Sequence, residues 1–246
     1  MTSKECPVCN AKNTIIVRNL RGQRTGKLIL LYYCNSCYSM FNPSGYRENN
    51  DVLKSDLEWH INNFDEHKIA SDRLVIKQLM EAHPRAKTFL DIGCGIGATV
   101  MQARDMGLEA EGVEPNRYAV DYAKEKLSLN LTCNYFRKDL YERKFDLIVC
   151  DQVLEHLENP RQLFEAAVYS LNRPGLIYIS VPFRKDPLRQ LIYTAFPQLP
   201  GTLFFDNDVH ITHFSTHSMK RWAADFQADS YQFIKIAGRG CIFSFS

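Results

Sequence analysis

The sequence predicts an α/β fold with a doubly wound, mostly parallel sheet, preceded by a small cysteine-rich module. Three observations lead to this prediction. Short apolar segments alternate with amphipathic helical segments from about residue 85 onward, which is the pattern of a parallel sheet with crossover helices. A glycine-rich turn follows the first of these segments, and two C-x-x-C pairs lie near the N-terminus. We therefore expect a metal-binding module over 1–42, a linker with helices over 43–84, and the α/β domain over 85–246.

Composition limits the functions that the chain can have. It has 246 residues, of which 45% are hydrophobic, and a formal net charge of +2. This size allows one α/β domain with a small attached module, and the near-neutral charge argues against a nucleic-acid partner. No apolar run reaches the ~18 residues of a membrane span, and no signal-peptide stretch follows Met1. We therefore predict a cytoplasmic protein whose cysteines are thiols or metal ligands.

The N-terminal module has the cysteine spacing of a zinc site. Its cysteines form two C-x-x-C pairs, namely Cys6 with Cys9 and Cys34 with Cys37. Four thiolates in tetrahedral geometry leave no open coordination position, which is typical of structural zinc. Segments 14–17 and 28–33 read as two strands around a polar turn, the plan of a zinc ribbon. A redox dithiol and a module without metal are the alternatives.

Helical patterns occupy the segment between the module and the α/β domain. Asn42 to Gly45 reads as a linker, and apolar residues then recur at spacings of three and four up to His83 and Pro84. The aromatic and histidine side chains of this segment are expected to pack or to lie on the surface rather than to carry chemistry; they are Tyr46, Trp59, His60 and His67.

The glycine-rich turn gives the first indication of a ligand. Residues 88–92 read as a strand, and Gly93, Gly95 and Gly97 let the backbone turn sharply toward a ligand. The spacing of these glycines also matches the dinucleotide-binding fingerprint of a dehydrogenase. Asp91, however, stands where a carboxylate can hold a ligand ammonium, which favours a cofactor that carries an amino acid. The stretch resembles the first motif, D-x-G-x-G-x-G, of the class I S-adenosylmethionine-dependent methyltransferases.

This resemblance implies a Rossmann-like sheet of seven strands that binds S-adenosylmethionine at the strand ends. Glu114, about 20 residues beyond the glycines, can accept both ribose hydroxyls, in NAD as in S-adenosylmethionine. In the resembled family an acid and the next backbone N–H after the third strand, expected near 131–136, bind adenine. The predicted cofactor-binding set is therefore Asp91, Gly93, Gly95, Gly97, Glu114, Pro115, Asp139, Leu140, Asp151 and Gln152.

The second half of the chain resembles one branch of that family. The run F-D-L-I-x-x-x-x-V-L-E-H-L, which begins at Phe145, is similar to members that methylate small molecules, quinone precursors and sugars. A fifth strand is expected over 176–182, and two final strands close the sheet as an antiparallel pair. The aromatic insert 183–209, which follows the fifth strand, is expected to be a substrate lid, with a dimer surface or plain packing as alternatives.

Methyl transfer to a hydroxyl requires that a proton leave, and a neutral histidine is the natural acceptor near neutral pH. His210 and His156 are the first candidates, followed by His213. The predicted function is S-adenosylmethionine-dependent O-methylation of a small molecule or sugar unit. The alternatives are an RNA base methyltransferase that uses the basic residues of the ribbon, and a protein that binds the cofactor without turnover.

Overall fold

The computed structural model describes residues 4–21, 28–43, 50–183, 210–236 and 240–246. It divides into two compact units. The first unit contains residues 1–47, 154–162 and 181–225, and the second contains 48–153, 163–180 and 226–246. The predicted ribbon, 1–42, thus shares a compact unit with segments from much later in the chain. Among the described residues, no helix combines the length and the apolar character that a membrane crossing requires.

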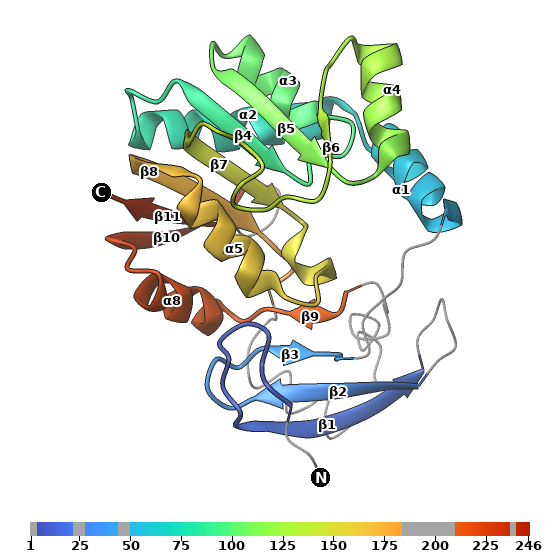
Figure 1. The fold of residues 1–246 in the computed structure, drawn as a ribbon, viewed down its shortest axis with the longest axis vertical. Coiled ribbons are helices and arrows are strands. Elements are labelled where there is room, and N and C mark those ends of the chain that lie inside the picture. Colours follow the sequence, from blue (N-terminus) through green and yellow to red (C-terminus); the bar gives the residue numbers. More distant parts are fainter. Residues whose placement is uncertain (1–3, 22–27, 44–49, 184–209, 237–239) are drawn as a thin grey trace. The chain divides into compact units, whose positions relative to one another are not determined.

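The second unit is built on a seven-stranded sheet with the order β10-β11-β8-β7-β4-β5-β6 (Figure 1). Its strands are β4 (Thr88–Ile92), β5 (Glu109–Glu114), β6 (Thr132–Cys133), β7 (Phe145–Asp151), β8 (Leu171–Ser180), β10 (Ser230–Ile234) and β11 (Gly240–Phe245). Strands β4 to β8 pair in parallel, whereas β11 pairs antiparallel with both β8 and β10. The predicted seven-stranded, doubly wound sheet is confirmed.

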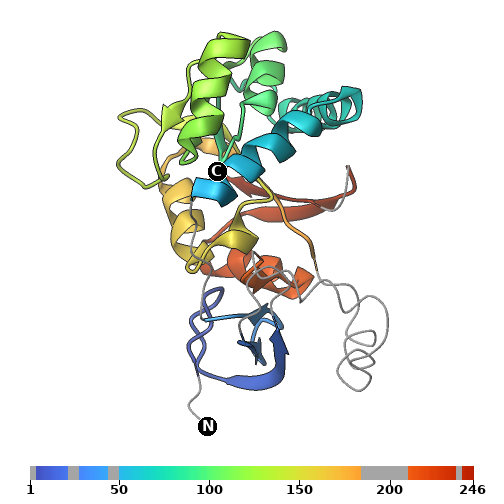
Figure 2. The ribbon, with the colours of Figure 1, turned by 90° about the vertical axis from the view of Figure 1, so that its right-hand side faces the viewer.

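Helices connect parallel strands, as the alternating pattern predicts: α3 (Ala98–Asp105) lies between β4 and β5, α4 (Arg117–Leu127) between β5 and β6, and α5 (Pro160–Tyr169) between β7 and β8. Two further helices, α1 (Asn50–Asn62) and α2 (Glu66–Ala82), precede β4. Apolar side chains of α2 and of the central strands, among them Leu79, Phe89 and Leu147, are fully buried in one core. Helix α1 packs beside α4 in both views (Figure 1, Figure 2). Packing in this core holds the parallel strands in place, and their carboxyl ends lie at the same edge of the sheet.

Two strand boundaries differ from the prediction. Strand β8 spans Leu171–Ser180 rather than 176–182, because the residues from Leu171 to Leu176 already pair with β7 across an irregularity between Phe145 and Leu147. The third predicted strand, 131–136, is reduced to the two residues of β6. Strand β6 lies at the sheet edge and pairs only with β5, so that a single row of hydrogen bonds defines its length.

The first unit contains a four-stranded sheet with the order β1-β2-β3-β9. Strands β1 (Thr14–Arg21) and β2 (Leu28–Cys34) pair antiparallel, as expected of a ribbon. The sequence did not predict that β9 (Thr212–His213) extends this sheet by pairing with β3 (Met40–Phe41). The unit also contains η1 (Leu154–His156) and α8 (Thr216–Asp225). Most of the predicted lid, 184–209, lies outside the described residues.

Candidate functional site

The glycine turn has a backbone conformation that side chains do not easily adopt. Gly93, Gly95 and Gly97 have φ angles of 73°, 54° and 83°, all in the left-handed region. A Cβ added at Gly95 would lie 2.6 Å from Cε1 of His60. Gly97 is the N-cap of α3 and has no side chain to cap it. The first backbone N–H groups of α3 therefore follow directly on a turn that only glycine forms without strain, and they are available to a ligand at the start of the helix.

Glu114 joins the glycine turn to the end of β5. Its Oε2 accepts a hydrogen bond of 2.9 Å from the Gly95 N–H, and its Oε1 accepts one of 2.8 Å from the Asn116 N–H. The side chain is buried. Each carboxylate oxygen can accept a second hydrogen bond, so Glu114 can hold the turn and receive a hydroxyl at the same time. The structure thus brings two predicted residues, Gly95 and Glu114, into direct contact.

Asp91 is buried at the carboxyl end of β4 and is 3% exposed. Burial raises the pKa of Asp91 to about 8, while the nearby positive charge of Lys68 acts in the opposite direction. A carboxyl group with this pKa is poised to ionise when a cation arrives. Asp91 therefore has the properties expected of a group that receives a ligand ammonium.

Lys68 of α2 lies among carboxylates from three elements. Its Nζ lies 2.5 Å from Oδ1 of Asp72 and 3.5 Å from Oδ2 of Asp151, and Asp91 also interacts with it electrostatically. Burial lowers the pKa of Lys68, but Asp72 and Asp151 outweigh this effect and leave the pKa above its ordinary value. One ammonium thus faces three carboxyl groups, and the region favours a further positive charge.

Sequence reasoning assigned no function to Lys68, Asp72 or His60. A signal for Asp72 was present, because it precedes the buried Val75, Ile76 and Leu79 at helical spacing and so places a carboxylate on the apolar face of α2. Lys68 lies one turn before it. His60 gave no comparable signal, since its place against Gly95 depends on how α1 packs.

The other predicted cofactor-binding residues have different surroundings. Asp139 is exposed, and the Leu140 N–H donates a 3.1 Å hydrogen bond to the Arg137 carbonyl. Gln152 has a φ of 57° and donates from its backbone N–H and from Nε2 to Ser180, each at 2.9 Å. Pro115 is partly exposed beside Glu114. Pro115 and Gln152 directly follow β5 and β7, whereas Asp139 and Leu140 lie in the segment between β6 and β7, because β6 already ends at Cys133.

The four cysteines of the first unit form one buried cluster. Cys6 Sγ lies 3.6 Å from Cys37 Sγ, and Cys9 Sγ lies 3.6 Å from Cys34 Sγ. Thiolates that bind one zinc at ~2.3 Å in a tetrahedron are ~3.8 Å apart. All four ligand atoms lie within 4.8 Å of one another. The donor set and its spacing therefore fit a structural zinc ion.

The two cysteine pairs share one backbone geometry. The Asn10 N–H donates to the Cys6 carbonyl and the Tyr38 N–H donates to the Cys34 carbonyl, both at 2.9 Å. Asn10 and Tyr38, each directly after the second cysteine of its pair, have φ angles of 59° and 61°. Each pair is therefore a tight turn that points its two sulfur atoms to the same place.

Side chains from late in the sequence hold these turns. The Trp222 Nε1–H of α8 donates a 2.6 Å hydrogen bond to the carbonyl of Val8, and Arg161 Nη1 donates to the same carbonyl at 3.3 Å. Arg161 also pairs with Asp225 at 2.8 Å. Ser215 Oγ donates to the Cys37 carbonyl at 2.6 Å. The cysteine site is thus embedded in a unit larger than the predicted ribbon.

Two of the three candidate histidines lie together. The ring centroids of His156 and His210 are 4.8 Å apart, with the rings at 68° to each other. His213, in contrast, is 3% exposed and belongs to β9, where it pairs with Met40. His156 and His210 can therefore act on one ligand, whereas the burial of His213 favours a structural role.

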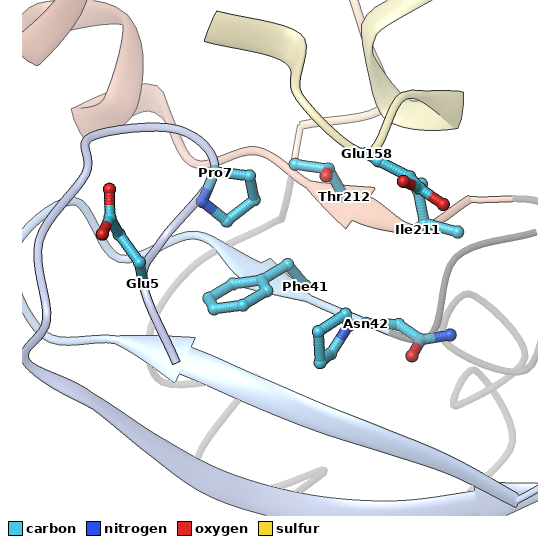
Figure 3. A pocket seen from close by; sticks show the side chains of 8 residues that line it. Glu5, Pro7, Phe41, Asn42, Glu158, Ile211 and Thr212 are labelled. Atoms are coloured by element: carbon cyan, nitrogen blue, oxygen red, sulfur yellow. The ribbon is translucent and has the colours of Figure 1, made fainter. Parts of the chain in front are cut away.

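A small cavity of about 190 Å³ opens in the same unit (Figure 3). Phe41, Pro7 and Ile211 provide apolar lining, and Glu5 and Glu158 also line the cavity. Glu158 and Ile211 follow His156 and His210 closely in the chain. The cavity combines an aromatic ring with two negative charges, which suits a small polar molecule better than a polyanion.

Comparison with known proteins gives relatives for this chain. The sequence model of the family described as "Methyltransferase domain" matches residues 61–231. The ubiquinone biosynthesis O-methyltransferase of Glaesserella parasuis is 30% identical over 117 residues, which are 43% of this chain and 50% of that protein. The mitochondrial enzyme of the same name from Schizosaccharomyces pombe is 28% identical over 116 residues, 44% of this chain and 42% of that protein. The chain thus spans half or less of these relatives.

Solved structures have a similar fold. The plantazolicin methyltransferase BpumL, solved in complex with a monoazolic desmethylPZN analog and SAH, superimposes with a TM-score of 0.58 at 14% identity, over 80% of this chain and 90% of that chain. PigF with SAH gives a TM-score of 0.58 at 20% identity, over 80% and 60% of the two chains. The family match covers most of the chain, and the sheet order and glycine turn agree with it. This chain belongs to the class I S-adenosylmethionine-dependent methyltransferase family.

Proposed function

We propose that this protein transfers the methyl group of S-adenosylmethionine to a hydroxyl oxygen of a small molecule or sugar unit. The observation that carries the proposal is the set of carboxyl groups that the strand ends bring near the glycine turn, namely Asp91, Glu114 and Asp151. S-adenosylmethionine carries a sulfonium and an ammonium, whereas NAD brings a pyrophosphate. An excess of negative charge at this sheet edge favours binding of S-adenosylmethionine and disfavours binding of NAD.

Each predicted residue then has a task. Asp91 receives the ammonium, Glu114 accepts the ribose hydroxyls while it holds Gly95, and Asp139 with the Leu140 N–H remains the proposed adenine site. Asp151 and Gln152 follow β7 and complete the cofactor-binding set. Once bound, the cofactor supplies an activated methyl group, so that the protein has to position the acceptor and exclude water.

The acceptor is proposed from the relatives and from the histidines. The curated relatives are named O-methyltransferases. A hydroxyl must lose its proton as the oxygen attacks the methyl carbon, and the contact between His156 and His210 supports this pair as the place where proton loss is assisted. His213 is the weaker candidate. The zinc held by Cys6, Cys9, Cys34 and Cys37 is proposed to be structural. A cytoplasmic location stays a prediction from the sequence.

Calorimetry with the full chain tests the cofactor. S-adenosylmethionine is expected to bind saturably and NAD is expected not to bind. Asp91→Asn should weaken S-adenosylmethionine binding by at least ~10-fold, because it removes the charge that pairs with the ammonium. Asp121→Asn, on the exposed face of α4, is the matched control. Saturable NAD binding without S-adenosylmethionine binding would refute the proposal.

Turnover tests the acceptor class. Transfer of a labelled methyl group is measured with a catechol, a phenol, a methyl glycoside and a short RNA as acceptors. His156→Ala or His210→Ala should lower kcat by ~10²–10⁴-fold and leave cofactor affinity within a fewfold, whereas His217→Ala, an exposed residue of α8, should change neither. Transfer only to RNA, with a steep salt dependence, would replace the small-molecule proposal with the RNA alternative.

A further inference from the structure

Glu155 lies close to the contact between His156 and His210. Glu155 precedes His156 in η1, and one ligand atom from each of Glu155, His156 and His210 lies within 4.8 Å of the other two. All three residues belong to the first compact unit. Two imidazole nitrogens and one carboxylate oxygen are a donor set that binds zinc in catalytic sites and iron(II) in others, in each case with coordination positions left open.

The distances allow one ion to be shared. Ligands that bind one divalent ion at 2.0–2.2 Å in a tetrahedron are ~3.4 Å apart. The three ligand atoms are at most 4.8 Å apart, so that they have to approach by no more than ~1.4 Å. Rotation about the side-chain bonds of the exposed His156 and the half-buried His210 is sufficient for such a movement.

Hydrogen bonds hold the two segments that carry these residues. Leu157, next to His156, donates from its N–H to the Leu154 carbonyl at 3.3 Å and accepts from Thr212 Oγ1 at 3.4 Å. Ile211, next to His210, accepts a 2.8 Å hydrogen bond from the Asn42 N–H. Thr212 belongs to β9 and thereby to the four-stranded sheet. The ligand-bearing segments are therefore joined by a hydrogen bond from the Thr212 hydroxyl to the Leu157 carbonyl, which does not depend on the three side chains.

The burial of Glu155 also fits a cation site. The residue is 2% exposed, and both of its carboxylate oxygens are inaccessible to solvent. An ionised carboxylate is costly to bury unless a positive charge lies beside it. A divalent ion that is bound by the carboxylate and by the two imidazoles would place such a positive charge beside Glu155.

We propose that Glu155, His156 and His210 bind one divalent ion of the first transition series, at a site separate from the four cysteines. The two sites differ in donor chemistry. Four thiolates select zinc and leave no open position, whereas a carboxylate and two imidazoles accept harder ions and leave room for an oxygen ligand. The second site is therefore suited to exchange ligands, and the first is not.

The role of this ion in catalysis rests on the proposed function. An acceptor hydroxyl that binds at the open position becomes more acidic, because the ion stabilises the anionic oxygen. Its O–H bond breaks and the proton passes to solvent water. The oxygen then forms a bond to the methyl carbon of the sulfonium, and the electron pair of the breaking S–C bond stays on sulfur. His156 and His210 assist proton loss as ligands rather than as proton acceptors.

Manganese binding tests the site independently of turnover. The full chain is dialysed against the weak chelator citrate, metal analysis checks that about one equivalent of zinc stays on the cysteines, and the protein is titrated with Mn²⁺ while the free ion is measured by electron paramagnetic resonance. Thiolates bind Mn²⁺ poorly, so that binding at the cysteines does not interfere. The wild type should bind about one equivalent. His156→Ala, which alters an exposed side chain, and Glu155→Gln should each weaken binding by at least ~10-fold, whereas His217→Ala should bind as the wild type does.

The outcomes separate this proposal from the proposed function. A wild type that does not bind Mn²⁺, or variants that bind it as tightly as the wild type, would overturn the metal site. Methyl transfer that proceeds equally in Glu155→Gln and in the wild type would overturn its role in catalysis. If Mn²⁺ binds as expected but no acceptor hydroxyl is methylated, the metal site stands and the proposed function fails.

Discussion

The glycine turn and the cysteine cluster are both tight backbone turns that prepare a binding site, but they are stabilised over different distances. Around the turn, the partner of Gly95 is Glu114, at the end of the next strand. Around the cysteines, the Val8 carbonyl is held by Arg161 and Trp222, on elements far along the chain. The first site depends on neighbouring strands of a sheet, and the second depends on distant segments and on a metal ion.

The largest effect is expected from removing one zinc ligand. Cys34→Ser should abolish stoichiometric zinc binding and unfold the cysteine region, because structural zinc contributes an apparent ~10–16 kcal/mol to the folding of small modules. Metal analysis and a thermal melt measure the change. Cys133→Ser, at an exposed cysteine, is the control and should behave as the wild type. A Cys34→Ser protein that retained one zinc would contradict the assignment.

A smaller effect is expected at the glycine turn. Gly95→Ala places a methyl group 2.6 Å from the His60 ring at a φ of 54°, and strain of ~1–3 kcal/mol should weaken S-adenosylmethionine binding by ~10–100-fold. Gly107→Ala is the control, since Gly107 has a φ of 91° but no atom within 4 Å of the added methyl. Equal loss of cofactor affinity in both variants would show that general destabilisation, not the contact with His60, is responsible.

The long-range support of the cysteine cluster is tested at Trp222. Trp222→Phe keeps an aromatic ring but leaves the Val8 carbonyl without its 2.6 Å hydrogen bond. We expect a loss of ~1–2 kcal/mol in the free energy of unfolding and faster transfer of zinc to a chelator. Trp59→Phe, at a residue that is 57% exposed, is the matched control. Unchanged zinc release in Trp222→Phe would mean that the cysteine turns do not need α8.

The smallest effect is a pH dependence at the glycine turn. Because burial raises the pKa of Asp91 to about 8, the free protein holds this proton near neutral pH and loses it as the pH rises toward 8. S-adenosylmethionine affinity should therefore rise severalfold from pH 6 to about pH 8, where the amino group of the cofactor begins to lose its own proton. Asp91→Asn should remove this rise. Lys68, Asp72 and Asp151 face Asp91, and Lys68→Met should shift the midpoint upward.

The same comparison explains what the sequence could predict. Asp91, Gly95 and Glu114 were predictable because alternating strands and helices bring consecutive strand ends to one edge. The C-x-x-C pairs were predictable from local spacing. The pairing of β9 with β3, and the contact of His156 with His210, depend on segments far apart in the chain, and no local pattern specifies them. The third strand was predicted too long because its length depends on having one neighbour.

The hydrogen bonds at Val8 have a consequence for synthesis. A ribosome releases Cys6 to Cys37 early, whereas Arg161 and Trp222 emerge only when most of the chain has been made. Until then the nascent cysteine turns lack the donors that hold them, and they remain open to exchange of the metal. During translation, zinc can therefore bind before the hydrogen bonds that hold the cysteine turns have formed, and a truncated chain that lacks α8 is expected to exchange its zinc faster than the full chain does.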